Sequence, residues 1–359
     1  MKYLKIFALA LFMVISCQPG KKFAFDDIEY IESFGEDETY IPSRLGHVVD
    51  LGIEGIQGFK IYGPYLIISS FNDAGQISIL EKDSPYRLLG SFFPKGNGPG
   101  ELVYPVLPNT MQFFTDGGGS VYAEFINGKS RQIRFDITRS IEEGRTVTEE
   151  LGKTGLLAFD AINIGEYGVF YREMAPEKDA FTRYIIKDEE RIVTKSMERL
   201  NSARIRNKED DGSRFNVLYG RIVFDKATKT FAEVPGEINA VHLYSLDDSF
   251  AKTICFGKTM YDYNELADRD YGDRPRTTIW TQQYDEALMI LYVDKTVEKY
   301  YTDETWRPSL ITVYWDGSYI SKANLPERVN QFDFDLDSFH LWAFDSDTET
   351  MYVYDVSNI

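Results

Sequence analysis

Short runs of alternating hydrophobic and polar residues recur along the chain, whereas amphipathic helical patterns are nearly absent. Residues 58–93 contain four such runs, GFKIYG, YLIISS, QISIL and YRLLGSFF, separated by turn-forming residues such as Gly63-Pro64. Alternation over a few residues between turns predicts β-strands. We therefore expect this region to form a four-stranded antiparallel meander.

The same grouping repeats along the rest of the chain. Five further groups of three or four runs follow, and the second run of each group recurs about every 55 residues between positions 68 and 342. A four-stranded unit that repeats at this spacing is typical of β-propellers. The sequence thus predicts an all-β fold, a six-bladed β-propeller with four-stranded antiparallel blades.

The sixth group contains only three predicted strands, VNQFDFD, FHLWAFD and MYVYDV. The run SRLGHVVDLG, at residues 43–52, precedes the first group and has no other partner. We expect this N-terminal strand to close the last blade, because it would join the two ends of the ring and pair the open strand edge. The predicted propeller therefore spans residues 43–359.

A glycine-rich stretch, KGNGPGE, separates the first two predicted blades. It lacks the glycine spacing of a dinucleotide-binding fingerprint and the Gly-Lys-Ser/Thr of a P-loop, and no helix pattern follows it. Glycine permits positive φ where an outer strand crosses to the next inner strand. We interpret the stretch as a structural corner, formed by Gly96, Gly98, Pro99, Gly100 and Glu101.

A closing strand, a first blade and a Gly-Pro-Gly-Glu turn into the second blade resemble the TolB-like six-bladed propeller lipoproteins, distant relatives of NHL-type propellers. The resemblance covers most of the predicted propeller as a pattern and is sharpest from Val48 to Pro105. It implies a secreted, lipid-anchored scaffold, and it supplies no catalytic residues.

The N-terminus carries the pattern of an export signal. Two lysines precede an apolar run from Ile6 to Ile15, which is too short to span a bilayer and suits the core of a secretory signal. Ser16-Cys17 at its end resembles the lipobox of bacterial lipoproteins, so Cys17 would be the acylated first residue. The alternative is a plain signal peptide with an incidental cysteine. We assign residues 1–16 to a signal peptide and 17–42 to a lipid-anchored tether.

Gln18 after the lipobox cysteine fits outer-membrane sorting in the lipoproteins that the chain resembles, facing either the periplasm or the cell surface. Loss of residues 1–16 removes the positive charges of Lys2 and Lys5 and takes the formal net charge from −18 to −20. Such a chain repels nucleic acid and anionic headgroups, so we expect it to contact the membrane only through its lipid. The remaining cysteine, Cys255, has no disulfide partner.

Propeller topology assigns the loops to two faces. Blade-to-blade crossings share one face, here called the crossing face, with the loops between second and third strands. This face receives the long loops 260–276 and 294–308, and long loops often carry function. They present side chains typical of protein-binding and glycan-binding surfaces: Tyr261, Tyr263, Tyr271, Arg274, Arg276, Tyr300, Tyr301, Trp306 and Arg307. The alternative is that several of them pack as loop cores.

Acidic residues suggest a second kind of site. A ring of channel carboxylates could bind calcium, as in propeller lactonases, and the candidates are Asp160, Asp333, Asp335 and Glu101. The alternation FDFD that contains two of them is also what any half-exposed strand shows. The three histidines lie in separate predicted strands, so no zinc site or catalytic triad is expected.

The favoured function is a non-enzymatic propeller, anchored through Cys17, that binds a protein or glycan partner with its crossing face and needs no cofactor. The alternative is a calcium-dependent propeller hydrolase or lyase with acidic residues in its central channel. The two hypotheses differ in their dependence on a divalent cation.

Overall fold

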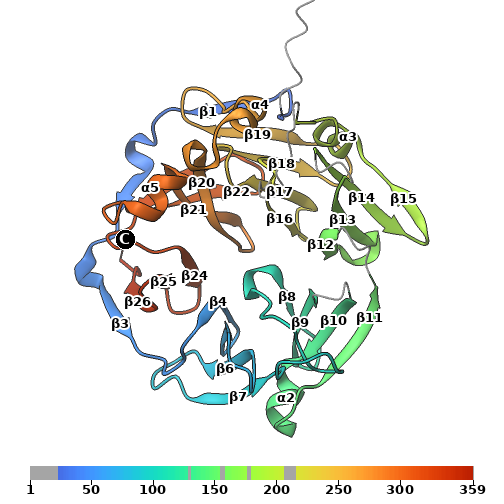
Figure 1. The fold of residues 1–359 in the computed structure, drawn as a ribbon, viewed down its shortest axis with the longest axis vertical. Coiled ribbons are helices and arrows are strands. Elements are labelled where there is room, and N and C mark those ends of the chain that lie inside the picture. The colour runs from blue at the N-terminus through green and yellow to red at the C-terminus, as the bar shows by residue number, and fades with distance from the viewer. Residues whose placement is uncertain (1–22, 128–130, 154–157, 176–178, 206–215, 359) are drawn as a thin grey trace, which may run out of the picture.

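Six β-sheets surround a central axis in the computed structural model, which describes residues 23–127, 131–153, 158–175, 179–205 and 216–358 (Figure 1). Each blade is an antiparallel meander of four strands, and in the sixth blade the N-terminal segment supplies one of the four. Two of the six sheets carry a fifth strand, which pairs parallel with the outer strand of the blade. The predicted all-β, six-bladed propeller is therefore confirmed.

Blades one to three follow one another along the chain. Blade one contains β4 (Ile56–Tyr62), β5 (Tyr65–Ser70), β6 (Ile77–Glu81) and β7 (Leu88–Phe92). Blade two contains β8 (Gln112–Thr115), β9 (Val121–Ile126), β10 (Arg131–Asp136) and β11 (Thr148–Lys153). Blade three contains β12 (Ala158–Asn163), β13 (Val169–Met174), β14 (Phe181–Lys187) and β15 (Glu190–Ile192).

Blades four to six complete the ring. Blade four contains β16 (Gly220–Asp225), β17 (Thr230–Pro235), β18 (Ala240–Ser245) and β19 (Ala251–Phe256). Blade five contains β20 (Pro275–Gln283), β21 (Ala287–Thr296), β22 (Ser309–Tyr314) and β23 (Ile320–Asn324). Blade six contains β24 (Gln331–Asp335), β25 (His340–Asp345), β26 (Thr350–Asp355) and the N-terminal β3 (Gly46–Val49).

Short helices occupy connections between strands. In the described ranges, the α-helices are α2 (Ile137–Glu143), α3 (Lys195–Asn201), α4 (Tyr263–Asp268) and α5 (Val297–Thr302). The 3-10 turns are η1 (Gly35–Asp37), η2 (Ser43–Leu45), η3 (Pro108–Thr110), η4 (Gly165–Tyr167) and η5 (Tyr271–Asp273). The run RIVTKSM, residues 191–197, has a pattern that predicts a strand, yet helix α3 begins within it. Thr194 caps this helix by accepting a hydrogen bond from the backbone N–H of Met197.

Strand β3 closes the ring as expected. It pairs antiparallel with β26, with Val49 opposite Met351 and Gly46 opposite Tyr354. A Cβ at Gly46 would lie 2.5 Å from the ring of Tyr354, so this pairing requires a residue without a side chain. The first and last parts of the propeller are thus held in one sheet.

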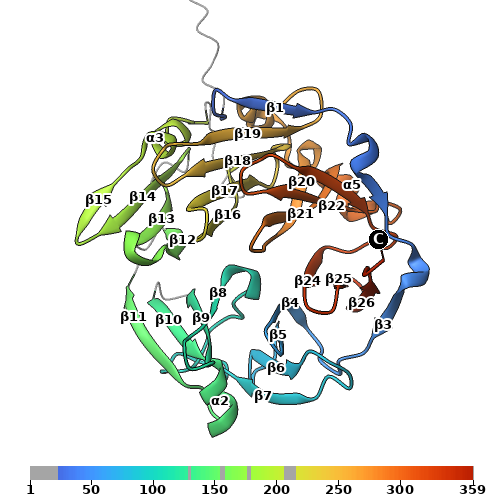
Figure 2. The same ribbon diagram turned by 180° about the vertical axis from the view of Figure 1, so that it is seen from behind.

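The segment before β3 differs from the expected tether. Strand β1 (Ile28–Ile31) pairs parallel with β19, and β2 (Glu38–Tyr40) pairs parallel with β23, so each extends its blade by a fifth strand. This segment runs along the outer rim of the ring (Figure 2). Phe23 and Phe25 are buried in the apolar cluster between blades three and four. Residues 23–42 therefore belong to the folded domain.

Hydrophobic clusters lie between neighbouring blades. Among the described residues, such clusters join blades one and two, three and four, four and five, five and six, and six and one. At the interface of blades two and three, Asn163 donates from its backbone N–H to Gln112 Oε1 at 2.9 Å and from its amide to Glu124 Oε2 at 3.2 Å. Polar contacts therefore replace an apolar cluster there, within the described part of the chain.

Replacing Phe25 by alanine tests the structural role of the N-terminal segment. Phe25 is 5% exposed and packs against Tyr244 with ring centroids 5.7 Å apart, so we expect a loss of about 3–5 kcal/mol in the free energy of unfolding. Tyr40→Ala is the matched control, because Tyr40 is 72% exposed and its loss should change stability by less than about 0.5 kcal/mol. Equal stability of both variants in urea titrations would mean that the segment is a mere tether.

Candidate functional site

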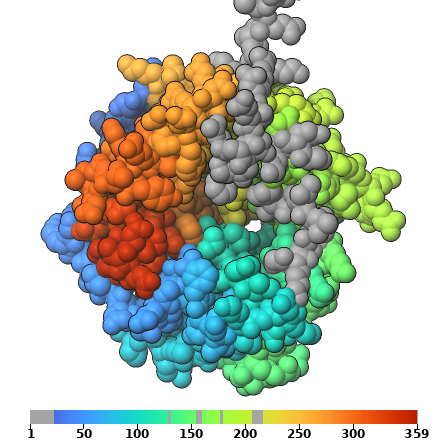
Figure 3. Space-filling view, in the orientation of Figure 1, coloured from blue at the N-terminus to red at the C-terminus, as the bar shows by residue number. Residues whose placement is uncertain are grey.

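The inner strands of all six blades line a cavity of about 840 Å³ along the axis of the ring. The space-filling view shows a small opening near the centre, beside the residues of blade two (Figure 3). One wall residue from each blade illustrates its polar character: Lys60, Gln112, Asp160, Arg221, Thr281 and Asp335. The cavity is therefore a polar channel rather than an apolar core.

Asp333 on β24 forms one buried cluster beside the channel. Its carboxylate accepts hydrogen bonds from Lys60 Nζ at 3.0 Å, from the Tyr284 hydroxyl at 2.8 Å and from the backbone N–H of Ile61. Burial, together with the charge of Asp333, raises the pKa of Tyr284 well above its ordinary value. The Asp333 carboxylate is thus already surrounded by donors.

Asp335, two residues further along β24, has its own cation. Lys82 Nζ lies 3.0 Å from Asp335 Oδ1 and also 3.0 Å from Asp337 Oδ2. The Ser338 hydroxyl donates to the other oxygen of Asp335 at 2.6 Å. Burial opposes ionisation, but these hydrogen bonds outweigh it and lower the pKa of Asp335. This carboxylate is therefore ionised and paired.

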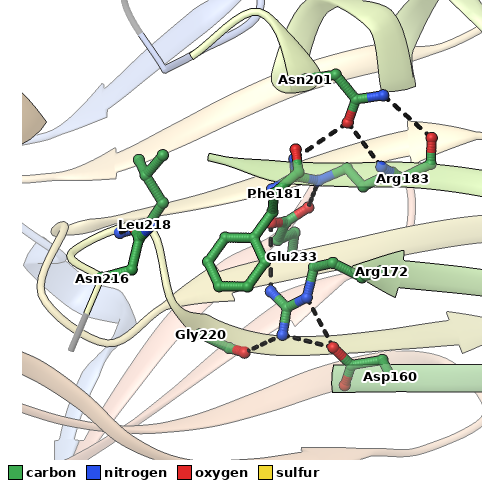
Figure 4. A network of polar contacts seen from close by, with 9 residues as sticks. All are labelled: Asp160, Arg172, Phe181, Arg183, Asn201, Asn216, Leu218, Gly220 and Glu233. Carbon is green, nitrogen blue, oxygen red and sulfur yellow. Dashed lines mark hydrogen bonds and ion pairs between the residues drawn. The ribbon is translucent and has the colours of Figure 1, made fainter. Parts of the chain in front are cut away.

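A third polar cluster joins blades three and four (Figure 4). Arg172 on β13 donates to Asp160 Oδ2 at 2.7 Å and to the carbonyl oxygen of Gly220 at 2.6 Å. Arg183 on β14 donates from Nε to Glu233 Oε2 at 2.7 Å, and Arg172 Nη1 lies 3.4 Å from the other oxygen of Glu233. Burial disfavours the charged carboxylate, yet the two arginines lower the pKa of Glu233 to about 2.

These contacts bear on the calcium hypothesis. Asp160 lies in blade three and pairs with an arginine, whereas Asp333 and Asp335 lie in blade six and pair with lysines. The Glu101 carboxylate accepts from the backbone N–H of Gly98 at 2.6 Å. Within the described ranges, no three His, Cys, Asp or Glu side chains converge as metal ligands would. The candidate acids therefore do not form one cation site.

The glycine-rich stretch is folded as a corner. The backbone N–H of Gly96 donates to Leu102 O at 2.9 Å, and Gly100 adopts φ +72°. A Cβ at Gly96 would lie 2.1 Å from Glu101 Oε2. The side chain of Gln76 donates to Leu102 O at 2.8 Å and fixes the corner to blade one. The stretch turns the chain between blades, as its composition predicts.

Four of the aromatic and arginine candidates on the crossing face are buried: Tyr263, Arg274, Tyr300 and Trp306. The rings of Tyr300 and Trp306 stack with centroids 4.9 Å apart, and the indole N–H of Trp306 donates to Tyr300 O at 2.9 Å. Tyr300, which belongs to helix α5, and Trp306 form a small hydrophobic core with Val293. The expectation that these four bind a partner is corrected, because their surfaces are used inside the protein.

The remaining candidates lie closer to solvent. Tyr271, Tyr301 and Arg307 are exposed, whereas Tyr261 and Arg276 are partly buried. The Tyr261 hydroxyl donates to Asp294 Oδ1 at 3.0 Å, and the Arg276 guanidinium lies 5.1 Å from the centre of the Tyr300 ring. The exposed surface is therefore smaller than the sequence suggests, and its role in partner binding stays a prediction.

Sequence reasoning missed the residues that give the channel its character. Buried polar atoms on its wall have no hydrogen-bond partner among the described residues, namely Thr281 Oγ1, Asn109 Oδ1 and Arg221 Nε. Arg221 lies in the run GRIVF, in which alternation predicts a strand but does not show which side chains reach the axis. An unpaired buried polar atom costs about 1–3 kcal/mol, so these atoms are suited to a polar ligand.

The fold and the channel define a six-bladed β-propeller with a polar central cavity. No family model matches the chain, and no curated protein matches it by sequence. Solved structures of similar fold include a candidate exported protein of Bacteroides fragilis, with 10% identity, 91% of this chain and 98% of that chain covered, and a TM-score of 0.49.

Two further similar structures carry functional names. Regucalcin, a calcium-binding protein of Agrobacterium tumefaciens, has 11% identity and a TM-score of 0.43, with 88% of this chain and 94% of that chain covered. A gluconolactonase of Xanthomonas campestris has 10% identity and a TM-score of 0.40, with 83% of this chain and 85% of that chain covered.

In the described part of the protein, no helix has the length and apolar character needed to cross a bilayer.

Truncating the buried aromatic pair should damage the fold rather than binding alone. Trp306 is 3% exposed, so Trp306→Ala should lower the free energy of unfolding by about 3–5 kcal/mol. Tyr301, on the same loop and 61% exposed, is the control, and Tyr301→Ala should keep stability within about 0.5 kcal/mol. A Trp306→Ala protein as stable as the native chain would contradict the loop-core assignment.

Acid should destabilise the protein partly through His242. Nδ1 of this buried ring shares a hydrogen bond with Thr253 Oγ1 at 3.1 Å. Burial lowers the pKa of His242 from 6.5 to about 4. Because the folded pKa lies below the unfolded one, the stabilising effect is complete above pH 6.5 and is lost as pH falls through about 4. The loss should be on the order of 3 kcal/mol.

The comparison of His242→Asn with His47→Asn, an exposed position, isolates this effect. Urea unfolding at several pH values between 7 and 4 should show a shallower decline in stability for His242→Asn and an unchanged decline for His47→Asn. Parallel declines for all three proteins would show that His242 does not resist protonation.

Proposed function

We propose that the protein is an exported β-propeller, lipid-anchored through Cys17 at the outer membrane, that binds a polar ligand in its central cavity without catalysis. This is the kind of scaffold that the resemblance to TolB-like propeller lipoproteins implies. The observation that carries the proposal is a set of buried polar atoms of wall residues that have no hydrogen-bond partner in the described part of the chain, namely Thr281 Oγ1, Asn109 Oδ1 and Arg221 Nε.

The size of the cavity favours a small ligand or the end of a larger one. Its volume of about 840 Å³ lies within the range of roughly 300–1,000 Å³ that is common for small-molecule sites. A glycan end or a short peptide segment of a partner fits this space, whereas a folded protein does not. The ligand would exchange hydrogen bonds with polar atoms that are otherwise unpaired.

The crossing face offers the entrance for such a ligand. Turn η3 and Tyr219 line the cavity there, and Leu107 and Tyr219 are partly or well exposed, at 36% and 46%. Aromatic and apolar surface next to polar groups is typical of sites that bind sugars and peptides. The exposed Tyr301 and Arg307 lie on the same face and could contact a larger partner.

The state of the channel acids supports binding rather than catalysis. A catalytic acid or base must exchange a proton at a position that substrate can reach. Asp333 and Asp335 are instead held by Lys60 and Lys82, and Asp160 is held by Arg172. In these pairs the carboxylates serve to position neighbouring strands.

Narrowing the entrance tests the proposal. Thr110 is exposed on η3 and lines the cavity, so Thr110→Trp should block access without disturbing the core. Calorimetric titration of residues 18–359 with a panel of mono- and disaccharides and short peptides should give a ligand whose affinity falls at least tenfold, about 1.4 kcal/mol, in this variant.

Thr305→Trp is the matched control, because Thr305 is exposed on the long loop 294–308 and does not line the cavity. It should bind the same ligand with unchanged affinity. Loss of binding in Thr305→Trp but not in Thr110→Trp would place the ligand on the loop surface, and a panel without any ligand sensitive to Thr110→Trp would contradict cavity binding.

A further inference from the structure

We propose that the cavity binds an anionic group, a carboxylate or a phosphate, and that Arg221 is the residue that binds it. The inference rests on the proposed cavity function and adds the chemical class of the ligand. Neither the pattern of the sequence nor the aromatic residues of the crossing face point to it.

The first argument is the balance of charge between blades three and four. Three arginines, Arg172, Arg183 and Arg221, meet two carboxylates, Asp160 and Glu233, in this region. Both carboxylates are engaged by Arg172 and Arg183 (Figure 4). Arg221, on which Asp160 acts at longer range, therefore remains without an ion pair of its own among the described residues.

The second argument is the local environment of Arg221. Its Nη2 donates to the backbone carbonyl of Asn109, and its Nε is buried without a hydrogen-bond partner. No carboxylate of the described residues lies within 4.0 Å of its guanidinium nitrogens as an ion pair. Burial lowers the pKa of Arg221, whereas Asp160 and Glu233 raise that of Arg172 against the effect of its burial. An arginine nevertheless keeps its charge at neutral pH.

The third argument is that Arg221 lines the cavity, whereas each of the other two cations there either has an ion pair or is exposed to solvent. Lys60 Nζ lies 3.0 Å from Asp333 Oδ1, and Lys226 is exposed to solvent. Among the described residues, Arg221 is thus the partly buried cation of the wall that has no ion pair. A guanidinium with unused N–H groups binds carboxylate or phosphate in a bidentate manner, and the hydroxyl of Thr281 is a further unpaired group on the same wall.

The lack of an ion pair at Arg221 predicts how its substitution affects stability when no ligand is added. Replacing Arg221 by glutamine removes a partly buried cation that has no ion pair among the described residues, so the melting temperature should stay the same or rise. Arg172→Gln should lower it by many degrees, because Asp160 and Glu233 would lose a buried partner. A strong loss of stability in Arg221→Gln would overturn the inference, since Arg221 would then have a structural role.

Chloride provides a probe that does not require the natural ligand. The excess linewidth of the chloride-35 resonance, measured with residues 18–359, reports exchange of chloride with protein sites. We expect Arg221→Gln to lose most of this excess, and Arg44→Gln, which removes the same charge at an exposed position, to keep it. An equal excess in the native protein and in Arg221→Gln, or none in the native protein, would overturn the inference.

Competition then identifies the anion and separates the two proposals. Sodium acetate or inorganic phosphate should abolish the excess linewidth in the native protein, and the one effective at lower concentration indicates the group that the site prefers. Glucose at equal concentration should leave the linewidth unchanged. If Thr110→Trp abolishes binding of a neutral ligand while chloride binding does not depend on Arg221, the cavity function stands and the anion inference fails. If chloride binding depends on Arg221 but no ligand is sensitive to Thr110→Trp, the proposed function fails instead.

Discussion

The pairing of β3 with β26 is the interaction on which the rest of the structure depends. It places residues from both ends of the propeller in one sheet, with Val49 opposite Met351 and Gly46 opposite Tyr354. Only in a closed ring do the inner strands of six blades face a common axis, and only then does a cavity of about 840 Å³ form between them. Closure also pairs the strand edge that blade six would otherwise expose to other chains.

Closure brings polar side chains together at the axis, where they must find partners. Most of them do so in pairs that link neighbouring strands or blades, such as Lys60 with Asp333 and Arg172 with Asp160. A buried ion pair is weak evidence for stability, because desolvation offsets much of the attraction between its charges. The pairs therefore fix the geometry of the channel more than they strengthen it. Arg221 has no ion pair among the described residues, and we infer that it makes the cavity a site for an anionic group.

The sequence predicts the fold well because propeller blades depend on local signals. Alternating runs between turn residues mark nearly every inner and middle strand, and the short sixth group points directly to the N-terminal strand that completes it. The sequence does not predict strands whose pairing leaves no alternation of hydrophobic and polar residues. Strand β11 has a polar, largely exposed sequence, and β1 and β2 add to sheet edges by parallel backbone pairing that requires no hydrophobic pattern. The site is less predictable, since composition cannot tell whether Trp306 packs inward or whether Arg221 reaches the axis.

The most direct test of the account is the position of a heavy anion in the protein. Crystals grown in sodium bromide, measured at the bromine absorption edge, locate bound bromide by its anomalous scattering. The account predicts a bromide ion in the central cavity within hydrogen-bonding distance of the Arg221 guanidinium, which is the partly buried cation of the wall without an anionic partner in the described structure. Bromide sites confined to the outer surface, with none in the cavity, would contradict it.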